Sequence, residues 1–214
     1  MIAVLKGDII HSRKLSNPEP WLIPLQDLFS LWGDAPKNWD LVWGDFFQVE
    51  IPNPEEALQK AMLIKALIKK TQTPNSGKIS SPVDVRMAIG IGEKTYSGAK
   101  ITESSGPAFF FSSERFDRLK KDRVNLAIQS PWEDLDQEIN LLLDFAGVIM
   151  DNWSISSAEL MEIVLNQPGI TQAQIGEKLG IKQNSVSGRW NRTHGDKLLK
   201  LEEFYRLKVQ QLSQ

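Results

Sequence analysis

The sequence contains no cysteine and no long hydrophobic run. Without cysteine it cannot form disulfides, a thiolate metal site or a thiol nucleophile. No window approaches the roughly 20 apolar residues of a membrane-spanning helix. The residues after Met1 lack the charged, apolar and small-residue sections of a secretory signal, and we find neither internal repeats nor low-complexity segments. These absences favour a cytoplasmic protein with an ordinary hydrophobic core.

The charge is small overall but unevenly distributed. The 214 residues have a formal net charge of −2, with 25 Lys and Arg against 27 Asp and Glu. Between residues 168 and 214, eight basic residues stand against four acidic ones, so this segment carries +4 and residues 1–167 carry −6. An acidic body with a basic C-terminal segment is typical of two units with different partners, although scatter alone can produce so small a difference.

The first 131 residues alternate between strand-like and helix-like patterns. Residues 39–51 predict two strands joined at Gly44-Asp45, because Gly and Asp both favour tight hairpin turns. The other predicted strands are 2–10, 83–92 and 123–129, with a short extended segment at 93–102. Helices are predicted at 18–32, 54–70 and 104–121. This order predicts an α+β or α/β unit.

Two clusters within the predicted helices have more than one interpretation. Lys65, Lys69 and Lys70 crowd the C-terminal half of the second helix, and we predict that they form a solvated face. The aromatic run Phe109–Phe111 in the third helix is predicted to lie in the core rather than to stack on a ligand.

From residue 133 the pattern becomes entirely helical. Apolar residues at helical spacing predict one amphipathic connecting helix up to Trp153 and a second helix beginning at Ser156 or Ser157. Pro168-Gly169 ends the second helix. A final helix is predicted at 195–212, where it can pack behind its neighbours or form a dimer contact.

Residues 170–187 have the spacing of a helix-turn-helix. Thr171 can cap the first helix, Gly176 is small enough for a second helix to cross closely, and Gly180 can adopt the positive φ of the turn. Ile175 and Val186 would lie in the small core between the helices. Other three-helix domains that bind proteins share this spacing, so the motif alone leaves that alternative open.

The second helix of this motif carries side chains suited to the major groove of DNA. Asn and Gln can pair with adenine, Arg with guanine, and Lys or Arg with phosphates. The candidate DNA-binding residues are Lys182, Gln183, Asn184, Ser185, Ser187, Arg189 and Arg192. A homodimer would match the two-fold symmetry of most operators.

Two Gly-Asp pairs occur at strand ends in the N-terminal region, at Gly7-Asp8 and Gly44-Asp45. Together with Arg86–Gly92 and Ser105–Phe109, they resemble the palm-like core of class III nucleotidyl cyclases and diguanylate cyclases. The pairing of these motifs with a C-terminal helix-turn-helix is similar to the SatD family. The resemblance covers most of the chain and implies architecture more than activity.

The resemblance implies a Mg²⁺ site and a nucleotide site. Asp8 and Asp45 match the two metal carboxylates of the cyclases, with the Ile9 carbonyl as a further ligand. Carboxylate oxygens suit Mg²⁺, which can neutralise charge in phosphoryl transfer. The candidate nucleotide-binding residues are His11, Ser12, Arg13 and Arg115. His11 and Arg13 can equally be polar loop residues, and both Asp residues can simply make turn hydrogen bonds.

The sequence departs from the cyclases where catalysis needs polar or positive groups. Phe110 stands at the position of the ribose-binding Asn, and Glu114 at that of the transition-state Arg, with Arg115 one residue away. Trp43 and Phe46 replace the first Gly and the Glu of the diguanylate cyclase signature. These substitutions favour binding over catalysis.

The sequence therefore predicts a ferredoxin-like or palm-like β-α-β-β-α-β domain at residues 1–131, a connecting helix at 132–154 and an all-α helix-turn-helix domain at 155–214. We expect a DNA-binding transcriptional regulator whose N-terminal domain senses a nucleotide or metal, or mediates dimerisation. The alternatives are a Mg²⁺-dependent nucleotide-processing enzyme and a protein-interaction module with neither activity.

Overall fold

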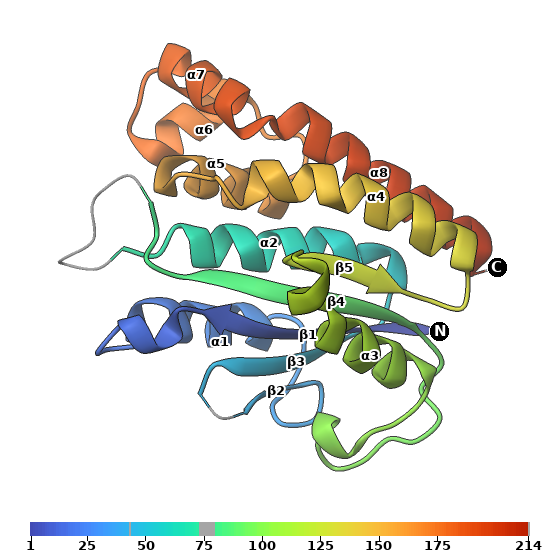
Figure 1. The fold of residues 1–214 in the computed structure, drawn as a ribbon. Helices are drawn as coiled ribbons and strands as arrows, with labels where there is room; N and C mark the ends of the chain where they lie inside the picture. Colours follow the sequence, from blue (N-terminus) through green and yellow to red (C-terminus); the bar gives the residue numbers. More distant parts are fainter. Residues whose placement is uncertain (43, 73–79, 214) are drawn as a thin grey trace.

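A computed structural model describes residues 1–42, 44–72 and 80–213. It contains a five-stranded mixed sheet with the strand order β2-β3-β1-β4-β5, covered by helices on both faces (Figure 1). The strands are β1 (Ile2–Ile10), β2 (Trp39–Val42), β3 (Phe46–Ile51), β4 (Asp84–Gly92) and β5 (Leu126–Gln129). The helices are α1 (Glu19–Ser30), α2 (Ala57–Lys69), α3 (Pro107–Asp122), α4 (Glu133–Met150), α5 (Ile155–Asn166), α6 (Gln172–Leu179), α7 (Gln183–Thr193) and α8 (Gly195–Leu212). An α+β chain is therefore confirmed.

The central strand β1 explains why the sheet has two apolar faces. It pairs antiparallel with both β3 and β4, while β5 joins β4 in parallel. Its odd-numbered residues Ala3, Leu5 and Ile9 enter the main core on the side of α1 and α2, and Val4 packs on the other face. Two covered faces account for the nearly continuous apolar run of this strand.

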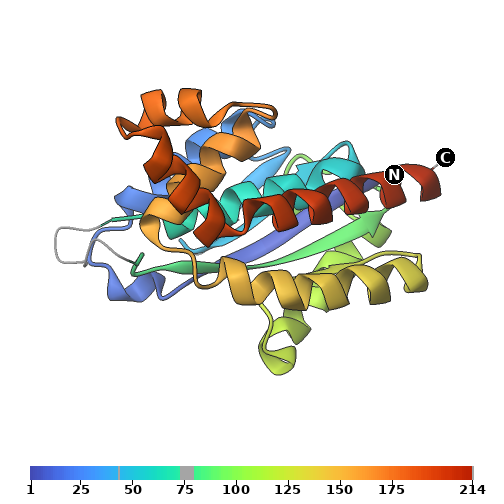
Figure 2. The same cartoon turned by 90° about the horizontal axis from the view of Figure 1, so that it is seen from above.

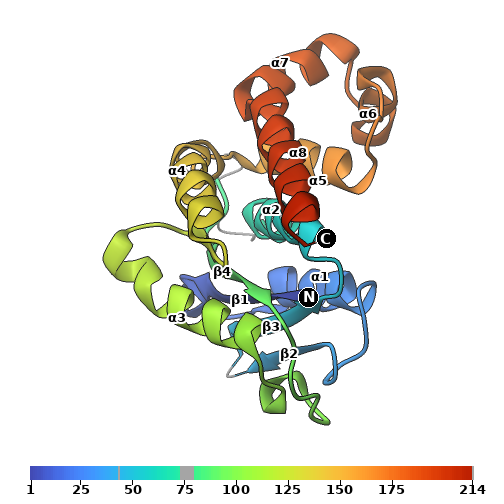
Figure 3. The ribbon, with the colours of Figure 1, turned by 90° about the vertical axis from the view of Figure 1, so that its right-hand side faces the viewer.

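Helix α3 covers the other face of the sheet (Figure 3), and β4 carries two glycines beneath it. A Cβ at Gly90 would lie 2.2 Å from the Ala108 carbonyl oxygen, and one at Gly92 would lie 2.8 Å from the Ala108 nitrogen. Only glycine allows the helix backbone to approach the strand this closely.

The C-terminal helices pack on α2 and share one continuous core with the sheet. Helix α2 is enclosed between the sheet below it and α5 and α8 above it, and α4 lies beside it over β5 (Figures 1 and 2). The short helix η2 (Pro54–Glu56), which precedes α2, contacts α8 through the buried Tyr205, whose hydroxyl donates to the Pro54 carbonyl oxygen at 2.8 Å. No helix among the described residues is both long and apolar enough to cross a membrane.

The structure corrects three predictions made from the sequence. Lys65 and Lys69 are only 3% and 7% exposed, because carboxylates and a carbonyl group surround them, so they are not a solvated face. Phe110 is 63% exposed and does not belong to the core, although Phe109 does. Among the described residues, the segment 93–102 forms no strand: it has an isolated bridge from Tyr96 to Ser105, just before α3, and leads into a short helix, η3 (Ile101–Glu103). Trp43 lies outside the described residues.

Candidate functional sites

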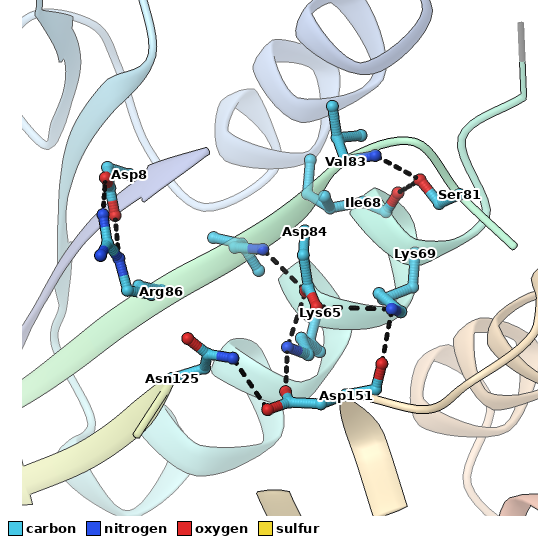
Figure 4. Close-up of polar contacts among 11 residues, drawn as sticks. Asp8, Lys65, Ile68, Lys69, Ser81, Val83, Asp84, Arg86, Asn125 and Asp151 are labelled. Carbon is cyan, nitrogen blue, oxygen red and sulfur yellow. Dashed lines mark hydrogen bonds and ion pairs between the residues drawn. The ribbon is translucent and has the colours of Figure 1, made fainter. Parts of the chain in front are cut away.

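The carboxylate of Asp8 is held by an arginine from the neighbouring strand. Asp8 and Arg86 are direct register partners on β1 and β4. The Arg86 Nε donates to Asp8 Oδ1 at 3.0 Å, and Nη2 donates to Oδ2, so the contact is bidentate (Figure 4). Both side chains are largely buried, with 16% and 23% of their surface exposed for Arg86 and Asp8. A bidentate guanidinium offsets the charge of Asp8 and uses both of its oxygens.

Asp45 lies in the turn between β2 and β3 and has different partners. The Ser12 hydroxyl donates to its Oδ2 at 2.7 Å, and its carbonyl oxygen accepts from the Ile9 nitrogen at 2.9 Å. Gly44 before it has φ +86°, which a tight turn requires. These bonds fasten the hairpin to the end of β1, so Asp45 has a clear structural role.

The other residues predicted near this site lie on the segment after β1. His11 is exposed with φ 65° and precedes a single helical turn, η1 (Ser12–Lys14), in which Arg13 is also exposed. Both side chains are accessible to a ligand. The structure therefore brings Ser12 to Asp45 and leaves His11 and Arg13 on the surface.

The arrangement around Asp8 and Asp45 does not fit a Mg²⁺ ion. Such an ion needs oxygen ligands in near-octahedral geometry, whereas a guanidinium already occupies both oxygens of Asp8. In the described part of the chain, no three His, Asp or Glu residues cluster as a metal site would require. Arg86 stands where a cation would bind, so the residues present here do not fit a metal ion.

Lys6 lies next to this ion pair, on the α3 side of β1. Its Nζ donates to the Ser113 hydroxyl at 3.0 Å and lies 5.3 Å and 5.8 Å from the ring centres of Phe46 and Phe116. Burial lowers the pKa of Lys6, and the negative charge of Asp117 partly opposes this. The sequence pattern did not predict this role for Lys6, because its partners on β3 and α3 are distant in sequence.

Arg115 lies away from Asp8, on the opposite flank of α3. Ser113 and Phe116 on one flank contact Lys6 of β1, whereas Glu114 on the other accepts a hydrogen bond from Gln129 of β5. Arg115 Nη1 donates to Asp122 at 2.6 Å. Arg115 therefore points away from His11, Ser12 and Arg13, the other residues that the cyclase resemblance suggested for nucleotide binding.

Arg115 instead lines an open cavity of about 570 Å³ between α3, β5 and the start of α4. Asp136 lies in the same cavity and accepts hydrogen bonds from the Ser130 nitrogen and hydroxyl. Burial raises the pKa of Asp136, although these hydrogen bonds and the charge of Arg115 lower it. Asp136 therefore ties the start of α4 to the end of β5, whereas Arg115 is held by Asp122 within α3.

A cluster of buried charges that the sequence did not predict joins α2, β4 and the end of α4. Lys65 Nζ lies 2.6 Å from Asp84 Oδ1 and 2.5 Å from Asp151 Oδ1 (Figure 4). Lys69 Nζ donates to the Asp151 carbonyl oxygen at 2.7 Å, and Asn125 donates to Asp151 Oδ2 at 2.8 Å. Asp151 comes directly after α4, so this cluster anchors the start of the C-terminal helices to the sheet.

Thr171, Gly176 and Gly180, the three residues on which the sequence prediction rests, determine how α6 begins, ends and turns into α7. Thr171 and Gln174 form a capping box at the start of α6. Gly180 ends α6 with φ +64°. A Cβ at Gly176 would lie 2.8 Å from the Ile181 carbonyl oxygen, so glycine is needed where the chain turns into α7.

Most of the seven predicted DNA-binding residues lie on the surface. Lys182, Gln183, Asn184, Ser185 and Arg192 are exposed, and Ser187 is half-buried. Arg189 differs, since its Nη1 lies 3.2 Å from Glu159 Oε2 of α5. The buried Val186 and Thr193 lie on the opposite side of α7. One face of α7 is therefore polar and open, with Arg189 at its edge.

No protein-family model matches the chain, and the curated proteins contain no match to it. The candidate functions therefore have to be distinguished by the geometry of these sites.

Proposed function

We propose that the chain is a DNA-binding regulator in which α6 and α7 form a helix-turn-helix and α7 enters the major groove. The observation that carries this proposal is the open polar face of α7, set on a helix pair with a glycine turn. The first residues of a recognition helix contact base edges in this class of motif. In α7 these are Gln183 and Asn184, both exposed.

The chemistry of this face separates base reading from phosphate contact. Gln183 and Asn184 can form paired hydrogen bonds with adenine. Lys182 and Arg192 lie at the two ends of α7 and can contact phosphates on either side of the groove. Arg189 would first have to break its ion pair with Glu159, so we expect it to contribute less than Arg192 to the free energy of DNA binding.

For the N-terminal region we propose a palm-like domain of the SatD type that supports the DNA-binding helices. The strand order β2-β3-β1-β4, with α1 and α2 on one face, supports this assignment. The Asp8–Arg86 ion pair favours a supporting or ligand-sensing domain over a Mg²⁺-dependent enzyme, because the enzyme would need both carboxylates free. The exposed His11 and Arg13 are the residues through which a nucleotide could still be sensed.

Selection from a random-sequence duplex library, followed by fluorescence anisotropy on the enriched duplex, tests the DNA-binding proposal. Asn184→Ala should weaken binding by about 1–3 kcal/mol and relax the preference at one base pair. Arg192→Ala should weaken binding to all sequences, and more than Arg189→Ala does. If the wild-type chain enriches no duplex and binds none at low salt, the proposal is wrong.

A further inference from the structure

Lys6 differs from the other lysines that the chain shields from water. It is half-buried on β1, and among the described residues no carboxylate forms an ion pair with it. Each of the other buried or half-buried lysines that the structure describes lies within 3.5 Å of a carboxylate oxygen. They are Lys60, Lys65, Lys69, Lys70, Lys94 and Lys208.

The acids around Lys6 are used elsewhere or lie too far away to pair with it. Asp8, two residues along β1, shares the same face of the sheet, but both of its oxygens accept from Arg86. The register partner of Lys6 on β3 is Gln48, whose amide carries no charge. Asp117 of α3 is exposed and acts on Lys6 through its charge alone. The ammonium form of Lys6 therefore lacks a direct counter-ion.

The groups in contact with the amine favour its uncharged form. Phe46 of β3 and Phe116 of α3 lie where an exposed lysine would have water, and an ammonium group loses hydration there. The ring faces attract a cation, but the loss of water outweighs this attraction, since burial lowers the pKa of Lys6 from its ordinary value of 10.5. Desolvation among apolar groups is one way in which proteins make a lysine nucleophilic.

We propose that Lys6 is a nucleophilic amine that holds a small aldehyde as a Schiff base, at the edge of α3 where it meets β1 and β3. The amine donates one hydrogen to the Ser113 hydroxyl at 3.0 Å, which leaves the nitrogen lone pair of the uncharged form to attack a carbonyl carbon. A nitrogen–carbon double bond forms, and the carbonyl oxygen leaves as water with the two hydrogens of the amine. The step needs no oxidant or reductant.

The side chains around the amine define the class of aldehyde. The rings of Phe46 and Phe116 lie edge to face, with 5.4 Å between their centres, and offer an apolar surface to a flat group. The exposed Asp117 repels an anion at this edge. Lys6 and both rings are half-buried rather than closed off, so the amine is within reach of a ligand from solvent. A flat, uncharged aldehyde fits these surroundings.

Reductive trapping with benzaldehyde tests the proposal on the full chain. Cyanoborohydride reduces the imine to a stable secondary amine, and peptide mass mapping then measures the labelling of each lysine. At about pH 7, Lys6 should be labelled about tenfold faster than the exposed Lys120 and Lys200, the effect of about one unit of pKa. The α-amino group of Met1 also reacts near this pH, so its peptide is measured separately.

The pH dependence of labelling separates a nucleophilic lysine from one that is merely accessible. Lys6 loses its proton before Lys120 does as the pH rises, because its pKa is lowered. The ratio of Lys6 to Lys120 labelling should therefore be greatest near about pH 7 and fall as the pH approaches 10.5. The charged groups that face the amine are Asp8 on β1, Arg86 on β4 and Asp117 on α3. None of them is of a residue type that titrates in this range.

Gln48→Glu supplies the carboxylate that Lys6 lacks. The substitution keeps the shape of the side chain and places a negative charge on the register partner of Lys6, which favours the ammonium form. We expect the labelling of Lys6 at about pH 7 to fall about tenfold, the effect of about one unit of pKa, while the labelling of Lys120 stays unchanged. Gln137→Glu, at an exposed position of α4, is the matched control and should leave the labelling of Lys6 unchanged.

Labelling of Lys6 no faster than that of Lys120 would overturn the proposal, as would a ratio that stays constant with pH. Equal labelling of Lys6 in the wild type and in a folded Gln48→Glu variant would also overturn it, because the missing carboxylate would then not explain the reactivity. Circular dichroism checks the fold of the variant, and the pH dependence of the wild type decides the question without any variant. No measurement involves DNA, so the outcome is independent of DNA binding by α7.

Discussion

Arg86 faces Asp8 across two adjacent antiparallel strands and donates to both of its carboxylate oxygens. The pair lies next to the hairpin turn, because the nitrogen of Ile9, the residue after Asp8, binds the carbonyl oxygen of Asp45. A cation supplied by the chain thus neutralises the carboxylate that a cyclase would use for metal.

Removing Arg86 should therefore destabilise the chain. Arg86→Met leaves the mostly buried Asp8 carboxylate without its counter-ion, and we expect the free energy of unfolding to fall by about 1–3 kcal/mol, below the cost for a fully buried pair because water reaches part of this one. Asp8→Asn combined with Arg86→Met should recover part of the loss, since no charge remains. Urea unfolding of the two single variants and the double variant measures this coupling. Additive effects of the two substitutions would show that the ion pair contributes nothing.

The buried lysine cluster should contribute more than any surface lysine. In Lys65→Met, Asp84 and Asp151 lose the ammonium group that lies within 2.6 Å of each, and among the described residues Lys69 is the one cation that still pairs with Asp84. We expect a loss of about 2–4 kcal/mol in the free energy of unfolding. Lys120→Met, at an exposed position of α3, should change it by less than about 0.5 kcal/mol. Equal effects of the two substitutions in chemical denaturation would contradict the role of the cluster.

Tyr205 should connect the stability of α8 to that of the sheet region. Its ring is completely buried and burial raises its pKa, so the hydroxyl stays protonated and donates to the Pro54 carbonyl oxygen. Tyr205→Phe keeps the ring but removes this hydrogen bond, while the Pro54 carbonyl oxygen still accepts from the Ala57 nitrogen, so we expect a cost of about 0.5–1.5 kcal/mol. Hydrogen exchange should show faster opening of both α8 and the start of α2. Faster exchange confined to α8 would mean that the two regions open independently.

Asp136 should give the stability a measurable pH dependence. Because burial raises its pKa in the folded chain above the ordinary value of 3.8, the folded state holds the proton more tightly than the unfolded state. The contribution of Asp136 to the free energy of unfolding is greatest below pH 3.8, and it is lost as the pH rises through the pKa of Asp136 in the folded chain. The free energy of unfolding of the wild type, minus that of Asp136→Asn, should therefore decrease over this range. A difference that is constant or increases with pH would contradict the raised pKa.

Much of the fold was predictable because its signals are local. The hydrophobic periods placed β1, the hairpin and α4 to α8, and Thr171 and Gly180 marked the ends of α6 through their capping and positive φ. Burial of Lys65 was not predictable, since it depends on Asp84 and Asp151, which are distant in sequence. The position of Arg115 relative to Asp8 was not predictable for a similar reason: one residue along a helix turns a side chain by about 100°, and a resemblance cannot fix that phase.

The salt dependence of DNA binding tests the central claim most directly. Each phosphate contact contributes about −0.9 to the slope of log K against log salt concentration. With the same duplex for every variant, Lys182→Gln and Arg192→Gln should each reduce the magnitude of this slope by about 1. Lys120→Gln is the control: it lies on α3, outside α6 and α7, and should leave the slope unchanged. Binding by the wild type with slopes identical in all three variants would contradict contact through α7, and no binding at about 50 mM salt would contradict DNA binding itself.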